Sequence, residues 1–424
     1  MTSSRLAILS LTLTIITNSA VAQLEFEDAP IGYHEATAND DIARLQRKID
    51  AGEVKLEFDD DHGYLPAVLK ALNISPTSQV LVFSKTSLQL RRIRPETPRA
   101  VYFNDDNYVG WVQRGDVMEV STVDPQLGAV FYTLAQEKVE SPQFIRDKGQ
   151  CLTCHASSRT KGVPGHLMRS VYSAPDGQPQ IGSGTYNSDH SSPFEKRWGG
   201  WYVTGTHGSM RHMGNVVTSS RRAIEDIDIE AGANITSLTD LVDTSPYLTS
   251  HSDIVALMVL EHQVQMHNLL TLASFETRSA LHYDQVMNAA LERPKDHRTE
   301  STSRRIAAVA DKVVKYALMT DEYVLESPIK GTSGFREHFE KLDPLDANGR
   351  SLRQLDLNTR LFRYPASFLL KSPSFAALPP EVKQSIQQRL KAALEGEGKP
   401  AEFPQLSDDD RRNLLALLGP ILKD

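Results

Sequence analysis

The chain has 424 residues, of which 40% are hydrophobic and 24% charged, and its formal net charge is -8. This is the composition of a globular protein, and the length corresponds to two or three structural units that can bury a core without cross-links. A mildly acidic chain is a poor candidate for binding nucleic acid or an anionic membrane.

The first 22 residues have the pattern of an export signal. Arg5 precedes a short apolar run over residues 6–16, and the small residues Ala20 and Ala22 fit the rule for signal-peptidase cleavage. A membrane anchor is disfavoured, because spanning a bilayer takes roughly 20 apolar residues. We therefore expect a mature protein that begins at Gln23, has no membrane span, and resides in the periplasm or outside the cell.

Residues 23–140 are predicted to form a β-rich N-terminal domain. Short helices are expected after Asn39 and over residues 64–72. The stretch from Asn104 to Asn107 lies between two runs of strand-forming residues and predicts a hairpin, and the two further strands expected are 117–123 and 129–134. The aspartates of the hairpin fit turn chemistry better than calcium binding, because oxygen ligands at the required spacing are missing.

The rest of the chain divides into a central segment, residues 141–220, and a predicted helical region, residues 221–424. The central segment is rich in Gly, Ser and His. A long helical pattern runs from about Ser252, the expected cap, to Glu292. The other expected helices are 301–325, 379–394 and 407–422. The elements together predict an α+β fold with a β-rich N-terminal unit and a mainly helical C-terminal half.

Residues 151–155 have the sequence CLTCH, which is the C-x-x-C-H attachment signature of c-type haem. Two thiols on one helical turn can reach both vinyl groups of a porphyrin, and the adjacent histidine then lies beneath the iron. A thioredoxin-like C-x-x-C belongs in a βαβ unit, which these surroundings do not match. A structural zinc site would need two further histidines. We expect one covalent haem c on Cys151 and Cys154, with His155 as the proximal iron ligand.

The segment around this motif resembles the c-type cytochromes. Residues 405–422 are similar to the helix that closes the haem crevice in many small cytochrome c domains, which suggests that residues 379–424 close the haem segment. The whole chain, with RWGGWYVTGTHGSMRHMGN and ALMVLEHQVQMHN, is similar to large bacterial cytochrome c-like proteins. The resemblance implies haem binding and export but no substrate. A simple electron carrier needs only about 100 residues, so the length departs from that pattern.

The sixth position on iron is expected to face residues 207–213. Met213 follows His155 at a separation comparable with that of the iron-binding methionine in small cytochromes, and it is the first candidate. Glycines in this loop allow close approach of the backbone. The alternatives in the same loop are Met210, His207 and His212. The competing explanation is that the methionines pack in the core and the histidines lie at the surface.

Two further groups are candidates for the haem surroundings. Arginine and tryptophan donors suit haem propionates and aromatic rings suit porphyrin faces, although an ordinary buried strand explains the same residues. The candidates of this kind are Arg197, Trp198, Trp201, Tyr202 and Arg211. Glu261, His262 and His267 suggest a metal site, but on a helix the two histidines point about 140° apart and cannot easily share an ion.

The chain has no G-x-S-x-G, P-loop or Rossmann glycine pattern, so nothing supports a hydrolase or a nucleotide-binding function. Two functions are consistent with the motifs that it does have. The first is electron transfer between periplasmic redox partners by a single-haem cytochrome. The alternative is a haem-dependent oxidoreductase with an open distal site and a small-molecule substrate. The extra length favours the alternative, whereas the single C-x-x-C-H motif argues against enzymes of the di-haem type.

Overall fold

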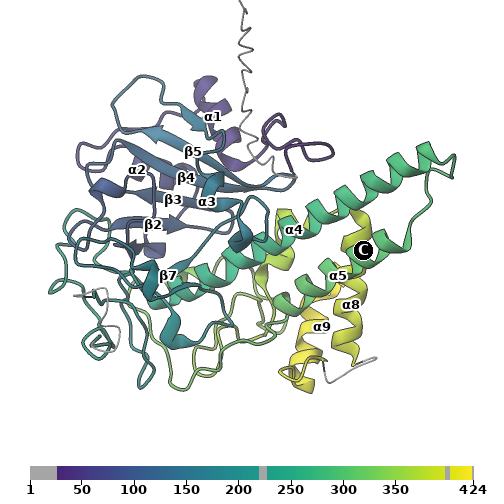
Figure 1. Cartoon of the computed structure of the whole chain (residues 1–424). Helices are drawn as coiled ribbons and strands as arrows, with labels where there is room; N and C mark the ends of the chain where they lie inside the picture. The colour runs from purple at the N-terminus through teal and green to yellow at the C-terminus, as the bar shows by residue number, and fades with distance from the viewer. Residues whose placement is uncertain (1–25, 219–226, 397–401, 423–424) are drawn as a thin grey trace, which may run out of the picture.

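The computed structural model describes residues 26–218, 227–396 and 402–422, so the predicted signal peptide and the start at Gln23 lie outside the described residues. Its central feature is an antiparallel sheet in which each strand pairs with the next one along the chain (Figure 1). The strands are β1 (Val80–Val82), β2 (Arg99–Phe103), β3 (Asn107–Trp111), β4 (Val117–Asp124), β5 (Gly128–Ala135) and β6 (Phe144–Arg146). A separate pair follows, β7 (Arg169–Val171) and β8 (Thr185–Asn187). With helices in the C-terminal half, the fold is α+β as predicted.

Short turns set the strand order. The side-chain oxygen of Asn104 accepts hydrogen bonds from the backbone N–H groups of Asp106 and Asn107, which confirms the predicted hairpin between β2 and β3. Between β4 and β5, the Asp124 carboxylate accepts hydrogen bonds from two backbone N–H groups of the turn that follows it. Because these turns are tight, strands that are consecutive in the sequence become neighbours in the sheet.

One face of the sheet packs against the N-terminal helix α1 (Asp41–Asp50), which contacts β4 and β6. The next helix, α2 (Leu65–Ala71), is joined to the turn between β2 and β3, where Asn104 Nδ2 donates to the carbonyl oxygen of Leu72 at the end of the helix. The Tyr132 hydroxyl in β5 donates a hydrogen bond of 2.7 Å to one oxygen of the Asp40 carboxylate. The other oxygen accepts from the Ala43 N–H and caps α1. A single buried carboxylate therefore starts this helix and fixes it to the sheet.

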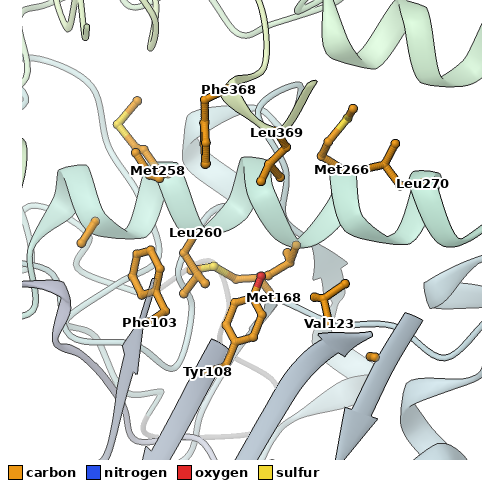
Figure 2. Packing of buried hydrophobic residues seen from close by; sticks show 14 of the residues in the cluster. Phe103, Tyr108, Val123, Met168, Met258, Leu260, Met266, Leu270, Phe368 and Leu369 are labelled. Carbon is orange, nitrogen blue, oxygen red and sulfur yellow. The ribbon is translucent and has the colours of Figure 1, made fainter. Parts of the chain in front are cut away.

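The opposite face of the sheet is covered in part by the long helix α4 (Ile254–Ala290). In Figure 2, Phe103 and Tyr108 of the sheet lie below the helix and Leu260 points toward them. On the other side of the helix, Phe368 packs against it. Because α4 is enclosed from two sides, apolar residues occur around most of its circumference and not on one stripe only.

The start of α4 differs from the prediction by one residue. The Asp253 carboxylate accepts hydrogen bonds from the N–H groups of Val255 and Ala256 and is the cap. The hydroxyl of Ser252, the predicted cap, donates instead to the carbonyl oxygen of Tyr202 at 2.6 Å. The serine therefore anchors the start of the helix to an earlier stretch of the chain.

The remaining long helices stack in the order of the sequence, the first on α4 and each later one on the helix before it (Figure 1). They are α5 (Glu300–Ala317), α8 (Pro380–Glu395) and α9 (Asp408–Leu422), with the short helices α6 (Phe335–Phe339) and α7 (Pro373–Ala376) between them. Ser407 caps α9 as predicted, since its hydroxyl accepts from the Asp410 N–H. None of the described helices is both long and apolar enough to cross a membrane.

The position of α8 and α9 bears on the predicted closure of the haem segment by residues 379–424. α8 packs on α5 and α9 packs on α8, and in Figure 1 both lie well apart from α3 (Leu152–His155). The apolar face of α9 is used for this packing, with Leu414 and Leu418 fully buried. Within the described part of the chain, these helices therefore close the α-helical half and do not cover the C-x-x-C-H motif.

Candidate functional site

The C-x-x-C-H motif folds as one short helical turn, α3, soon after the last strand of the sheet. The N–H groups of Cys154 and His155 donate to the carbonyl oxygen of Cys151 at 3.1 and 3.0 Å. The Asp147 carboxylate accepts from the Cys151 N–H at 2.9 Å and holds the start of the turn. Both cysteines are free thiols, Cys151 half-buried and Cys154 exposed. This is the local geometry that the spacing of the motif requires.

The ring of His155 is held in one tautomer. Its Nδ1 lies 2.9 Å from the carbonyl oxygen of Gly165. Because a carbonyl only accepts, Nδ1 carries the proton and Nε2 keeps its lone pair. Nε2 receives no hydrogen bond from the described residues, and burial lowers the pKa of His155. A neutral imidazole that donates from Nδ1 to a backbone carbonyl is the form that binds metals through Nε2.

The sheet face near α3 is left uncovered along one row. The residues that pair across five strands in this row are Val101, Gly110, Glu119, Thr133 and Ile145. Paired residues share one face of a sheet, and we call this set the open row because four of the five are at least partly exposed, Ile145 to 61%. The next row on the same face, with Phe103 and Tyr108, is buried beneath α4 (Figure 2).

The α3 turn lies close to the border between these two rows. The His155 ring is 4.8 Å from the ring of Phe131 in the buried row. On the open side, the charges of Arg99 and Glu119 both act on the pKa of His155, in opposite directions. The imidazole is therefore backed by an aromatic ring and neighboured by a charged pair.

Polar atoms without partners occur on Glu119 of the open row and on Arg99 of β2, which forms an ion pair with it. Arg99 Nη1 lies 3.0 Å from Glu119 Oε2, with the side chains 18% and 17% exposed. Arg99 Nε and Glu119 Oε1 are buried and have no hydrogen-bond partner in the described part of the chain, although such atoms normally have one. Between them lies Gly110, which is buried, and an added Cβ there would meet the Arg99 side chain at 3.5 Å. A partly exposed charged pair beside two thiols and an imidazole nitrogen without a partner has the ligand and the polar groups that a porphyrin needs.

The environment of Cys151 does not favour thiolate chemistry. Burial, with the neighbouring Asp147 charge as the next cause, raises the pKa of Cys151 to about 12. A thiol that stays protonated is a poor redox nucleophile or zinc ligand. No group of three or more His, Cys, Asp or Glu side chains within the ranges described is arranged to hold a metal ion. The thioredoxin-like and zinc alternatives therefore gain no support.

In the structure the Met213 side chain is buried and packs against Ser170 and Gly199. Its sulfur accepts a hydrogen bond from the Ser170 hydroxyl at 3.5 Å, and its methyl group fills the space beside Gly199. In β7, Ser170 and its neighbour Arg169 point to opposite sides, and Arg169 is the residue that interacts electrostatically with Cys154. The described contacts therefore do not bring Met213 against α3, and its role as an iron ligand stays a prediction from the sequence.

The two histidines of the 207–213 loop are hydrogen-bonded within the core. His207 Nδ1 lies 2.7 Å from the Met210 carbonyl oxygen, and its Nε2 accepts from a backbone N–H. His212 Nδ1 also accepts from a backbone N–H, and the two histidine rings lie 4.7 Å apart. Burial lowers the pKa of His212 to about 3. Both histidines are buried, so they are not the surface groups that the competing explanation supposed.

Four of the five candidates for propionate binding have protein partners. The fifth, Trp198, lies beside Glu261, and its buried Nε1 makes no hydrogen bond of good geometry to the described residues. Arg197 Nη1 lies 3.2 Å from Glu261 Oε2, with the side chains 3% and 0% exposed. Trp201 Nε1 donates to a backbone carbonyl of β7, and the Tyr202 hydroxyl donates to another backbone carbonyl. Arg211 forms an ion pair near the surface. Among the described residues the other four donors are therefore already engaged.

His262 and His267 of α4 do not share a partner among the described residues, in keeping with their angular separation. His262 Nδ1 lies 2.9 Å from His190 Nδ1, and its ring stacks on Tyr316. His267 Nε2 lies 2.8 Å from the carbonyl oxygen of Asp105. Both rings are buried and serve to join α4 to neighbouring loops.

Four residues next to the motif were not predicted: Gly165, Asn268, Arg99 and Glu119. Gly165 and Asn268 come from a loop and from α4, so no local pattern connects them with the motif. A partial signal exists for Glu119, because it alternates with apolar residues in β4 and so had to lie on the face away from α1. Its nearness to His155 required the tertiary structure.

Comparisons with known proteins assign no family. No family model, curated protein or solved structure matches the chain. The functional argument therefore rests on the motif and on the contacts around it.

Proposed function

We propose that the protein is an exported single-haem c-type cytochrome that transfers electrons between redox partners in the periplasm. One observation carries the proposal. His155 Nδ1 donates to the Gly165 carbonyl and leaves Nε2 free on the same helical turn as the two cysteines of the chain. Thioether bonds to Cys151 and Cys154 and an axial bond from Nε2 need this juxtaposition.

The residues of the site have separate roles in this proposal. Cys151 and Cys154 hold the haem, so that it is not lost by dilution after export. The carbonyl oxygen of Gly165 fixes the His155 tautomer and increases the electron donation of Nε2. When bound, the haem iron supplies reversible one-electron oxidation and reduction. The open row offers the protein surface that covers the group from solvent.

A second candidate function is a haem-dependent oxidoreductase. The observation in its favour is the ion pair of Arg99 and Glu119, whose unpartnered Nε and Oε1 atoms lie at the open row near His155. A charged pair at an iron site can bind and protonate a small molecule. An electron carrier has no need of such groups, so the coordination of the iron decides between the two functions.

The first test is the covalent bond. The exported protein should keep its haem in the pellet after acid-acetone extraction, and the double variant Cys151→Ala/Cys154→Ala should contain none. Colour that moves into the solvent from the unaltered protein would refute the proposal. The intact mass should equal that of a chain starting at Gln23 plus one haem, recovered from the periplasmic fraction.

The second test separates the two functions. Ferric and ferrous spectra should be recorded with and without carbon monoxide. A low-spin ferric protein whose ferrous form resists carbon monoxide supports electron transfer, because both axial positions are then filled. A high-spin protein that binds carbon monoxide readily would favour the oxidoreductase, and Arg99→Ala should then change the rate of ligand binding.

A further inference from the structure

Asn268 in α4 is hydrogen-bonded to the backbone of His166, next to the glycine that binds the His155 ring. Its Oδ1 accepts a hydrogen bond from the His166 N–H at 2.9 Å, and its Nδ2 donates to the His166 carbonyl oxygen at 2.9 Å. Two bonds from one amide fix both polar groups of a single backbone residue. Asn268 is 2% exposed, so water does not compete for either bond.

Gly165, the residue before His166, connects this contact with His155. Gly165 donates its N–H to the His155 carbonyl at 2.8 Å, and its own carbonyl oxygen accepts from His155 Nδ1 at 2.9 Å. An added Cβ on Gly165 would lie 2.2 Å from Asn268 Oδ1. Glycine is therefore required here by the closeness of the asparagine, and the asparagine determines where the carbonyl points.

We propose that Asn268 is a positioning residue for the axial histidine, holding the Gly165 carbonyl on His155 Nδ1 and so setting the reduction potential of the haem. This inference rests on the proposed function. A hydrogen bond from Nδ1 to a carbonyl makes the imidazole a stronger electron donor. Stronger donation stabilises ferric iron, so a loosened carbonyl favours ferrous iron.

The test is the reduction potential of the holoprotein with Asn268→Ala. Both bonds to His166 are lost, and we expect the ferrous-to-ferric ratio at a fixed ambient potential to rise three- to tenfold. For a one-electron couple this is a rise of roughly 30 to 59 mV.

Asn288 provides the matched control. It is a buried asparagine on the same helix, 1% exposed. Its Nδ2 donates to the His297 carbonyl oxygen at 2.8 Å, and this contact does not involve α3. Asn288→Ala should lower the free energy of unfolding in urea, as Asn268→Ala does, but should leave the reduction potential of the haem unchanged. An unchanged potential in Asn268→Ala, or an equal shift in Asn288→Ala, would overturn the inference.

A double-mutant cycle tests the contact itself without reference to the haem. Gly165→Ala should reduce the folded-to-unfolded ratio strongly in the unaltered protein. In the Asn268→Ala background the clash with Oδ1 is absent, and the reduction should be at least tenfold smaller. If the two substitutions had additive effects on stability, the contact between Asn268 and Gly165 would be refuted. If their effects were coupled but the unaltered protein contained no haem, the contact would stand and the proposed function would be refuted.

Discussion

The carboxylate of Glu261 and the guanidinium of Arg197 meet at 3.2 Å in a part of the core from which both side chains are shielded from solvent. Burial is the larger influence on the carboxyl group and raises the pKa of Glu261 to about 8, against the opposing effect of the Arg197 charge. The second oxygen, Oε1, has no hydrogen-bond partner in the described part of the chain. Proton binding by Glu261 is therefore coupled to folding.

The first prediction concerns this proton. A carboxyl group whose pKa is raised by folding stabilises the protein fully below its unfolded pKa, near 4.5, and this contribution is lost as the pH rises to about 8. Glu261→Gln has no such proton. Relative to the unaltered protein, the variant should therefore become progressively more stable between pH 5 and pH 8, by at most about 1.4 kcal/mol per pH unit.

Urea unfolding at several pH values measures this difference. Glu276→Gln, a substitution on the same helix at a more exposed ion pair, is the control and should follow the unaltered protein. Parallel profiles for Glu261→Gln and the unaltered protein would show that Glu261 is ionised throughout this range.

The second prediction concerns the arginine of the pair. Arg197→Ala removes a buried guanidinium that donates to the backbone carbonyls of His190 and Ser192 as well as to Glu261. The free energy of unfolding should fall by roughly 2–5 kcal/mol, most strongly above pH 8, where Glu261 is left charged without its partner. Arg211→Ala, at an ion pair whose Glu230 side chain is 68% exposed, should have a much smaller effect. Chemical denaturation measures both. If Arg197→Ala instead changed the haem spectrum and spared stability, the propionate role predicted from the sequence would be restored.

The third prediction concerns the open row. Gly110→Val places a branched side chain against Arg99 and Glu119. An added Cβ meets both residues at 3.5 Å or more, which is ordinary contact, so the free energy of unfolding of the haem-free chain should change by no more than about 1 kcal/mol. The haem content of the exported protein should fall, because the branched side chain occupies the surface assigned to the porphyrin. Gly182→Ala, where nothing lies within 4 Å, should leave the haem content unchanged. Equal haem content in Gly110→Val would move the haem site away from the sheet.

The fourth prediction separates two roles of Met213. From its packing against Gly199 and Ser170, we expect Met213→Ala to lower the free energy of unfolding by roughly 2–5 kcal/mol and to leave the haem spectrum unchanged. Loss of a thioether-to-iron band, a lower reduction potential and new binding of carbon monoxide would instead establish Met213 as the distal ligand. Met210→Ala, at another buried methionine of the same loop, should affect stability only.

Much of the fold followed from local patterns. The hairpin at Asn104, the strands β4 and β5, and the capped helix after Ser407 each depend on residues within a few positions of one another. The cap of α4 was misplaced because Ser252 and Asp253 are both good cap residues, and only the distant Tyr202 carbonyl shows that the serine is used elsewhere.

The candidate site was predictable to a smaller extent. The C-x-x-C-H spacing contains its own geometry, so Cys151 to His155 could be identified from the sequence. The partners of His155 could not, because Gly165 is positioned by an asparagine 103 residues further along, which no local rule connects to it. Arg197 and Glu261 were both noticed as candidates, but that they bind each other was visible only in the fold.

The half-buried position of Cys151 has a consequence for how the protein is made. In the folded chain the thiol is enclosed beside Asp147 and its high pKa keeps it protonated, whereas the thiolate is the reactive form of cysteine. If haem is attached as proposed, bond formation is easiest on the newly exported chain, before the segment after β6 closes on the sheet. Maturation would then run in a fixed order, with export first, haem attachment second and completion of the fold last, and a chain that folds too early would remain colourless.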